Sequence, residues 1–227
     1  MTTLEEGKSG EFRTFEDTPP KLCLNTPNKQ LSGNGLCAFA LTTFVLSINN
    51  SGSYYLQLPN IVVGLALFYG GLVQLIAGLW HLKAGNTFGA TAAGSFGAFW
   101  LSYASNFIFR LTDFYIPEDP FAVDHAIGIY LLAWTIFTFL LTLAALKTNG
   151  ATLLLFFFLN IAMVLLTLGK FYQLSEDVKG PNGLTKAGGV FGILTSLMAW
   201  YNAFAELITL ETSYFTLPVY DLSHKRR

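Results

Sequence analysis

Charge is what this 227-residue sequence has least of: 12% of its residues are Asp, Glu, Lys or Arg, against 52% that are hydrophobic. Soluble domains average about 25% charged residues, so the composition excludes an ordinary soluble enzyme. No charged residue lies between Lys29 and Lys83. Other uncharged stretches, each close to the roughly 20 residues that a helix needs to cross a bilayer, are 84–109, 125–146, 148–169 and 187–205. The sequence therefore predicts an integral membrane protein.

Cysteine, basic clusters and catalytic motifs are also scarce. The two cysteines, Cys23 and Cys37, have neither metal-ligand spacing nor the pattern of a disulfide framework. The net charge of −1 and the lack of a basic patch with interleaved aromatics argue against a nucleic-acid partner. No nucleophile with a base and an orienting group, no paired histidine ligands and no phosphate-binding glycine loop can be assembled. We therefore expect no enzyme activity, no metal and no cofactor.

The hydrophobic segments favour an all-α protein over a β-barrel. A membrane barrel would show short segments that alternate apolar and polar residues, whereas residues 153–159 are an unbroken run of Leu and Phe. The run after Lys29 is too long for one crossing, and turn-forming residues at 49–53 divide it. Six crossings follow, the first of them short, at about 35–48, 58–82, 88–111, 125–146, 151–171 and 187–210.

The distribution of basic residues predicts the orientation. Cytosolic loops and tails are enriched in Lys and Arg, and with six spans the two termini share a side. That side would hold nine of the 13 basic residues, namely Lys8, Arg13, Lys21, Lys29, Lys83, Lys147, Lys225, Arg226 and Arg227. We therefore expect both termini in the cytosol. Residues 1–31 are then a mostly disordered tail, 32–216 the six-helix transmembrane domain, and 217–227 a second tail.

Small residues recur at helical spacing in three of the segments, where they would let helix backbones approach each other. They are Gly64, Gly71 and Gly78; Gly89, Ala93 and Gly97; and Gly188, Gly192 and Ser196. These stripes could pack helices within one bundle or form a contact between subunits. The sequence leaves both interpretations open.

Uncharged polar residues occur within the predicted spans, where lipid would penalise them. Such residues either bond helices together or line a solute path, and for the two large amides, Gln74 and Asn160, the interpretations are evenly balanced. Glu206 is the only carboxylate that could lie within a span. Its separation from Ala187, about 29 Å along a helix, puts it near the cytosolic interface, as either a solvated acid or a proton carrier.

Three blocks of the sequence resemble one family of membrane proteins. They are GLCAFALTTFVLS at 35–47, FYGGLVQLIAG at 68–78, and GNTFGATA at 85–92 continuing to GAFWL at 97–101. In order and spacing they are similar to the acetate uptake transporter family, which includes bacterial succinate–acetate permeases and fungal proteins named for outward ammonia transport. The first block resembles the fungal branch more than the bacterial one.

The resemblance implies a protomer of six transmembrane helices with its own pore, assembled into a homo-hexamer in the plasma membrane. The implied solutes are acetate and similar short monocarboxylates, with proton coupling. The family's pore constriction falls on Phe39, Phe96 and Leu159, while Glu206 stays the candidate proton relay. The residues that we expect along the solute path are Thr42, Thr43, Tyr69, Gln74, Trp100, Asn160 and Asn202.

Two positions depart from the family pattern. The signature before the first helix, Asn-Pro-Ala-Pro-Leu-Gly-Leu, corresponds to residues 30–36, which retain only the final Gly-Leu. Phe96 stands where the family commonly has tyrosine, which removes a hydroxyl group from the constriction. An ammonia or ammonium export pathway, or a membrane sensor or scaffold that transports nothing, therefore stays an alternative.

Overall fold

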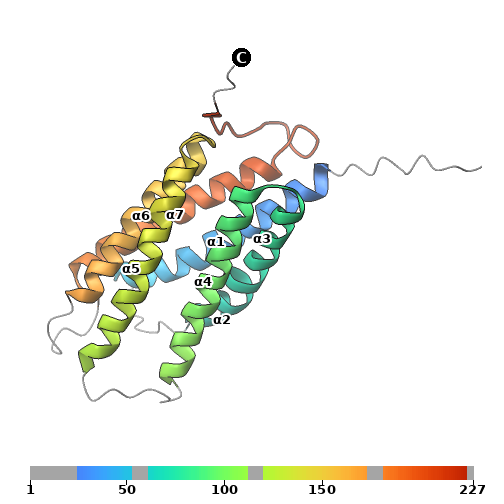
Figure 1. The fold of residues 1–227 in the computed structure, drawn as a ribbon. Helices are drawn as coiled ribbons and strands as arrows, with labels where there is room; N and C mark the ends of the chain where they lie inside the picture. The colour runs from blue at the N-terminus through green and yellow to red at the C-terminus, as the bar shows by residue number, and fades with distance from the viewer. Residues whose placement is uncertain (1–24, 53–60, 112–119, 173–180, 224–227) are drawn as a thin grey trace, which may run out of the picture.

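The computed structural model describes residues 25–52, 61–111, 120–172 and 181–223, and most of these residues are helical (Figure 1). The elements, in chain order, are α1 (Asn25–Ser51), α2 (Ile61–Leu67), η1 (Phe68–Val73), α3 (Gln74–Lys83), α4 (Thr87–Leu111), α5 (Pro120–Ala145), α6 (Gly150–Phe171) and α7 (Gly183–Leu207). Because α2, η1 and α3 follow one another without a break, they form one long helix. The described residues therefore form six long helices.

Four helices in the described residues are long and apolar enough to cross a membrane. They are Ile61–Lys83, Ala122–Ala145, Gly150–Phe171 and Gly183–Leu207. The prediction of an all-helical membrane protein is therefore confirmed. The helices α1 and α4 are not among the four, and both are rich in hydroxyl, amide and glycine residues. Polar side chains in membrane helices usually face the interior of the bundle, so these two helices are the natural suppliers of a polar interior.

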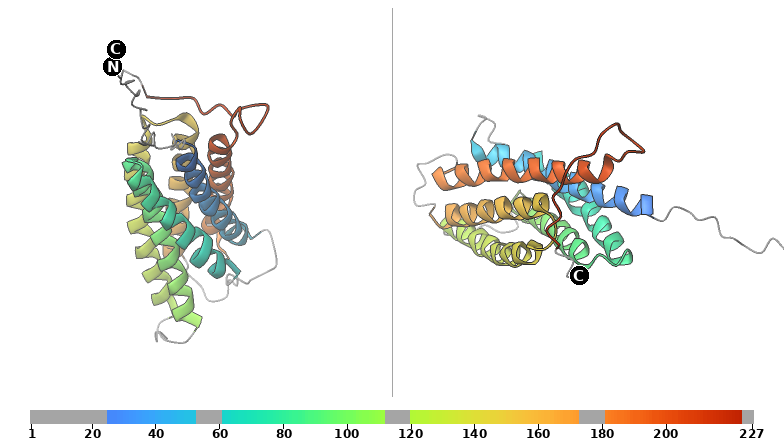
Figure 2. Two further views of the ribbon diagram at one scale, coloured as in Figure 1. Left: turned by 90° about the vertical axis from the view of Figure 1, so that its right-hand side faces the viewer. Right: turned by 90° about the horizontal axis from the view of Figure 1, so that it is seen from above.

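The helices pack around a common interior. α1 lies against α7 and against the α2–η1–α3 helix, α7 lies against α6, α6 against α5, and α3 against α4. The helices α4 and α5 meet through aromatic side chains, since the Phe99 ring centroid is 5.9 Å from that of Tyr130 and 5.1 Å from that of Trp134. Figure 2 shows from two further sides how the helices run alongside one another. Side chains far apart in the sequence therefore meet inside the bundle.

Three helices begin four or more residues earlier than the sequence predicts, and α5 is one of them, since it starts at Pro120 instead of residue 125. α1 starts at Asn25 instead of residue 35, because Pro27 is tolerated in a first helical turn. The part of the predicted tail at residues 25–31 is therefore helical, while 1–24 lie outside the described residues. α7 starts at Gly183 instead of residue 187, because the side chain of Asn182 accepts a hydrogen bond from the Thr185 N–H (2.8 Å) and caps the helix.

The element η1 is a π-helical stretch inside the second long helix, which the sequence predicts as a plain α-helix. π-Helical turns are rare and occur frequently at functional sites. A Cβ at Gly70 would lie 2.6 Å from the hydroxyl oxygen of Thr42 on α1. Glycine at this position therefore lets η1 approach α1 closely.

The small-residue stripes mainly join helices of the same chain. A Cβ at Gly78 on α3 would lie 2.6 Å from the Cα of Gly94 on α4, so the two backbones touch. A Cβ at Gly188 on α7 would lie 2.9 Å from the side chain of Leu166 on α6. Gly64 differs, because no described atom lies within 4 Å of a Cβ built there. Packing within one bundle thus accounts for Gly78 and Gly188 but not for Gly64.

The chain after α7 returns to cover the beginning of α6. The N–H of Gly150 donates a hydrogen bond to the carbonyl oxygen of Tyr220 (2.8 Å), and the N–H of Ala151 donates to that of Val219 (3.4 Å). The first N–H groups of a helix have no acceptor within the helix itself. Residues 218–222, which we call the C-terminal strap, therefore cap α6, although the sequence predicts a simple tail at this point.

Candidate functional site

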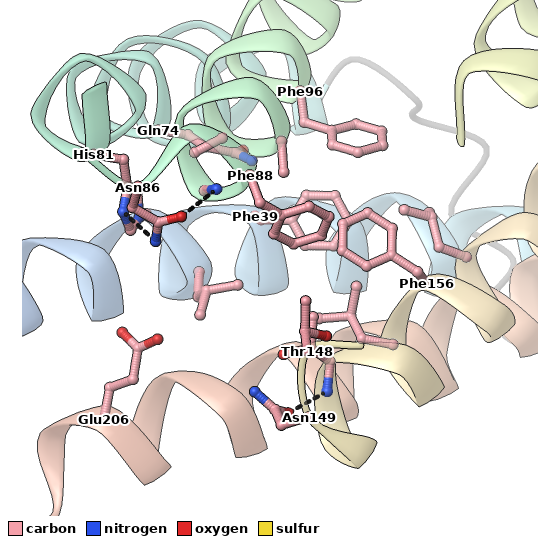
Figure 3. A pocket seen from close by; sticks show the side chains of 18 residues that line it. Phe39, Gln74, His81, Asn86, Phe88, Phe96, Thr148, Asn149, Phe156 and Glu206 are labelled. Carbon is pink, nitrogen blue, oxygen red and sulfur yellow. Dashed lines mark hydrogen bonds between the residues drawn. The ribbon is translucent and has the colours of Figure 1, made fainter. Parts of the chain in front are cut away.

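A cavity of about 280 Å³ lies inside the bundle, at the end that holds the α3–α4 and α5–α6 turns (Figure 3). Its walls come from the first half of α1, from both of these turns and from the last turn of α7. The lining residues are Gly35, Leu36, Phe39, Gln74, His81, Asn86, Phe88, Gly89, Ala92, Ala93, Phe96, Thr148, Asn149, Thr152, Leu155, Phe156, Leu159 and Glu206.

On four helices the lining of the cavity stops at one identifiable residue. On α1, α4 and α6, which all run away from this end of the bundle, the last lining residues are Phe39, Phe96 and Leu159. On α3, which runs the opposite way, Gln74 is the first lining residue. The structure thus brings together the three residues that the resemblance assigns to the constriction and adds Gln74 beside them. We call these four residues the collar.

The collar is closely packed, and two of its four residues are aromatic. The ring centroids of Phe39 and Phe96 are 5.5 Å apart, and Phe96 and Leu159 are both almost fully buried. The ring of Phe156 lies 6.4 Å from that of Phe96 and 5.6 Å from that of Phe88. Figure 3 shows these rings gathered on one side of the cavity, away from His81 and Glu206. A carboxylate moving toward the rings loses hydrating water, which is costly without replacement hydrogen bonds.

The α3–α4 turn positions a histidine and an asparagine in the cavity wall. Gly85, at φ +74°, ends α3 in the left-handed conformation, and the N–H of Asn86 donates to the carbonyl oxygen of His81 (2.9 Å). The side-chain oxygen of Asn86 then caps α4 by accepting from the N–H of Gly89 (2.9 Å). The Asn86 Nδ2 lies 3.3 Å from the His81 Nδ1. This short turn therefore holds the imidazole and the amide together.

The α5–α6 turn supplies a second polar wall. The side chain of Asn149 caps α6 by accepting from the N–H of Thr152 (2.8 Å). The Thr152 hydroxyl donates to the Oδ1 of Asn202 on α7 (3.0 Å), and the Nδ2 of Asn202 donates to the carbonyl oxygen of Met198 (2.8 Å). Asn202 thus lies behind Thr152 and joins α6 to α7 instead of lining the cavity.

Glu206 brings a carboxylate into the wall of the cavity. It is half-buried near the end of α7, and Figure 3 shows its side chain across the cavity from His81 and Asn86. Glu206 lies near the end of α7, where the sequence predicts it. Its surroundings are more enclosed than those of a solvated surface acid, because the carboxylate shares a cavity with the collar.

The other residues expected on the solute path lie outside the cavity lining. The Thr42 hydroxyl donates to the carbonyl oxygen of Ala38 (2.9 Å) in its own helix. The Asn160 Nδ2 lies at hydrogen-bonding distance (3.5 Å) from the carbonyl oxygen of Thr135 on α5, and Tyr69 is half-buried in η1. Thr42 and Asn160 therefore have partners within the bundle.

Thr43, Gln74 and Trp100 differ from these bonded residues. Each is buried and has a side-chain polar atom with no hydrogen-bond partner among the described residues: Oγ1 of Thr43, Oε1 of Gln74 and Nε1 of Trp100. Leaving a buried polar group unsatisfied costs roughly 1–3 kcal/mol. Three such groups in the interior of one bundle call for an explanation.

Sequence reasoning did not identify the polar rim of the cavity. His81, Asn86, Thr148, Asn149 and Thr152 all line it, but on the sequence they stand at helix ends, where polar residues are ordinary. One signal was present, because His81 follows Gln74 by seven residues and therefore lies on the same helix face. Among the described residues, no three His, Cys, Asp or Glu side chains are grouped as a metal site would need.

The family of the chain follows from comparison with known proteins. A sequence model of the GPR1/FUN34/yaaH family matches residues 24–224. The chain belongs to this family. The resemblance carried by the three sequence blocks is thereby confirmed.

Several relatives have been named for transport. Ammonia transport outward protein 2 of Saccharomyces cerevisiae is 44% identical over 82% of this chain and 66% of its own length. Acetate permease A of Emericella nidulans is 44% identical over 82% of this chain and 63% of its own length. The chain therefore spans slightly less than two thirds of these fungal relatives. The solved structure of the bacterial acetate channel SatP matches with a TM-score of 0.70 and 28% identity, covering 84% of this chain and 98% of the channel.

Proposed function

We propose that this member of the GPR1/FUN34/yaaH family moves acetate and similar short monocarboxylates across a membrane through the cavity and the collar, and that it is not an enzyme. The observation that carries the proposal is that Phe39, Gln74, Phe96 and Leu159, from four helices, line the same cavity, where the rings of Phe39 and Phe96 lie 5.5 Å apart. We call the cavity as far as the collar the chamber. A chamber with a polar rim, closed by a mostly apolar collar, suits a small solute with one polar group. The names of the acetate permease and of the SatP acetate channel support this choice.

The chamber and the collar would act in sequence on the solute. The chamber, at about 280 Å³, has room for a small carboxylate together with several water molecules. His81 and Asn86 can donate hydrogen bonds to the carboxylate, and Gln74 offers an amide at the level where water is lost. The rings of Phe39 and Phe96 offer no donor at all. Solutes that are large, or that carry several charges, would fail at the collar because their dehydration is too costly.

Glu206 is our candidate for the proton relay. It shares the cavity with His81, so two groups that can exchange protons face the solute before the collar. A proton held at Glu206 could be passed to the carboxylate of the solute, which would lower the cost of its dehydration. This role predicts that the pH dependence of transport comes from ionisable side chains that line the chamber. The collar contributes none, because its four residues carry no ionisable side chain.

We further propose six membrane crossings per protomer, with α1 and α4 as the two polar ones, and a homo-hexamer in which each protomer has its own pore. The termini would face the cytosol of a plasma-membrane protein, because Lys83 and Lys147 flank the turns beside the cavity and basic residues concentrate on the cytosolic side. The outward-facing apolar side chains suit lipid or neighbouring protomers. Examples are Phe68, Leu79, Phe139 and Phe157.

Labelled acetate and purified protein in liposomes test the proposal. At neutral pH, where acetate is mostly ionised and crosses lipid slowly, we expect uptake well above that of empty liposomes. A variant that blocks the collar from inside, Leu159→Trp, serves as the matched control because it should fold in the same membrane and lose the flux. Uptake by the native chain that equals uptake by empty liposomes contradicts the proposal.

An ammonium pathway is a second candidate, favoured by one observation. Glu206 places a carboxylate in the cavity wall, and a carboxylate attracts a cation such as ammonium. The name of the yeast relative points the same way. Methylammonium and acetate fluxes, measured in the same liposomes, separate the two functions: Glu206→Gln should abolish a methylammonium flux, whereas an acetate flux should persist with an altered pH dependence.

A further inference from the structure

The contact between α4 and α5 is made by aromatic side chains instead of closely packed backbones. Among the described helices, α5 shares an extended backbone contact only with α6. Ring pairs bridge the space from α4 to α5, with centroids 5.1–6.3 Å apart. These separations lie in the range of about 4.5–7 Å at which aromatic pairs attract each other. The arrangement of α4 and α5 therefore depends on where these rings lie.

The ring of the collar residue Phe96 has five aromatic neighbours among the described residues. They are Phe39 on α1, Phe99 on α4 itself, Trp134 and Phe137 on α5, and Phe156 on α6. Only Phe39 and Phe156 also line the cavity, so the other three lie behind Phe96 as seen from the solute. A phenylalanine ring has no hydrogen-bonding group that could fix it. The rings behind Phe96 therefore decide how far it can turn away from Phe39.

Trp134 is the ring behind Phe96 that covers it most flatly. The two centroids are 6.1 Å apart, and the planes differ by 32°, the smallest angle among the Phe96 ring contacts of the described residues. The indole is itself enclosed, because its centroid lies 5.1 Å from that of Phe99 and 5.6 Å from that of Phe137. A ring with neighbours on several sides has little room to yield when Phe96 presses against it.

Hydrogen bonds anchor this part of α5 to α4. The hydroxyl oxygen of Tyr130 lies 2.7 Å from the Oγ of Ser102 and 3.2 Å from the carbonyl oxygen of Phe99. Tyr130 precedes Trp134 by one helical turn, and their ring centroids are 6.4 Å apart. Trp134 thus contacts both an anchored tyrosine and the collar ring.

We infer that Trp134 is a positioning residue of the collar, whose indole ring holds the Phe96 ring against Phe39 and so sets the width of the constriction. A helical phenylalanine has two common side-chain positions about χ1, and removal of the indole opens space on the α5 side into which the ring can turn. Trp134 does not line the cavity, so it acts on the solute through Phe96. The inference rests on the proposed function and adds a residue that controls size selection from behind the pore.

Removal of the indole should relax the selection of solutes by size. In liposomes that contain the full chain, Trp134→Ala should raise the ratio of lactate flux to acetate flux on the order of tenfold. Trp134→Phe should restore most of the native ratio, because a ring again covers Phe96. Trp200→Ala is the matched control: Trp200 is also a half-buried tryptophan, but it packs on Phe44, with centroids 5.2 Å apart. This control should keep the native ratio.

A double-mutant comparison tests whether Trp134 acts through Phe96. In a chain that already carries Phe96→Ala, adding Trp134→Ala should not change the flux ratio further, because the positioned ring is gone. The same additional rise in both backgrounds overturns the inference. An unchanged ratio in Trp134→Ala, or an equal rise in Trp200→Ala, overturns it as well. Trp134→Leu makes the same comparisons if Trp134→Ala does not fold.

A readout that does not depend on transport comes from 4-fluorophenylalanine at position 39 of the full chain in lipid. Phe39 contacts Phe96, at a centroid distance of 5.5 Å, so its ¹⁹F resonance should shift in Trp134→Ala and keep its native position in Trp200→Ala. A resonance that stays in place in Trp134→Ala refutes the positioning role and leaves the proposed function standing. If the native chain carries no acetate flux, the proposed function fails, and the role of Trp134 in selection fails with it.

Discussion

Truncation of the collar residue Leu159 gives the sharpest test of how the constriction selects solutes. Leu159→Ala removes the three outer carbon atoms of a side chain that is 5% exposed. In a closed core, leucine-to-alanine changes cost about 2–5 kcal/mol, and here we expect about 2 kcal/mol because the new space adjoins the cavity. An apolar site that discriminates by one methylene-sized group does so by roughly 10–200-fold. The ratio of lactate flux to acetate flux should therefore rise on the order of tenfold.

The assay measures labelled lactate and acetate uptake into the same liposomes. Leu155→Ala is the matched control, since Leu155 lies one turn earlier on α6, is equally buried and lines the cavity on the chamber side of the collar. It should cost similar stability and leave the lactate-to-acetate ratio unchanged. An unchanged ratio in Leu159→Ala, or an equal rise in both variants, would show that the collar does not set the size limit.

Three further predictions concern the parts that position the cavity. Gly78→Leu should destabilise the protein by about 1–3 kcal/mol, because the Cβ of the new leucine meets the α4 backbone. The loss is measured as a lower melting temperature in detergent. Gly64→Leu is the control and should have little effect on stability. Asn86→Ala should cost about 0.5–2 kcal/mol through loss of the α4 cap, whereas Asn86→Ser should keep most of that stability and still slow acetate uptake. Tyr201→Phe removes a hydrogen bond to the strap at Pro218 (2.6 Å) and should speed hydrogen exchange at the start of α6, and unchanged exchange would contradict the capping role.

The helices were largely predictable because membrane insertion leaves a strong mark on composition. Each uncharged run of about 20 residues predicted a helix. Within the described residues, each predicted helix overlaps a helix of the structure. The errors fall where local chemistry decides the boundary. α1 begins before its apolar core, and α7 begins at the Asn182 cap. The hydrophobicity of the sequence does not predict where α1 and α7 begin, because the cap and the first turn of a helix are usually polar.

The site was predictable only in part. The family resemblance pointed to Phe39, Phe96 and Leu159, and the structure brings them to one end of a cavity. His81 was missed because a histidine in a last helical turn is an ordinary surface feature on the sequence. Asn160 and Asn202 looked equally suited to a solute path, yet both have partners in neighbouring helices. Which polar group keeps a free hydrogen-bonding position depends on contacts between helices, and periodicity describes only one helix at a time.

The sequence alone determined that this chain is a helical membrane protein of low charge, because its long uncharged stretches lack the alternation of apolar and polar residues that a membrane β-barrel shows. It also determined the family, through blocks that stay local in the chain. The tertiary structure alone decided which residues meet: the four that form the collar, the histidine and carboxylate that share the chamber, the strap that caps α6, and the buried indole and hydroxyl left without partners. The physical reason is that hydrophobicity acts on each segment separately, whereas a cavity and its unsatisfied groups exist only where several helices pack together.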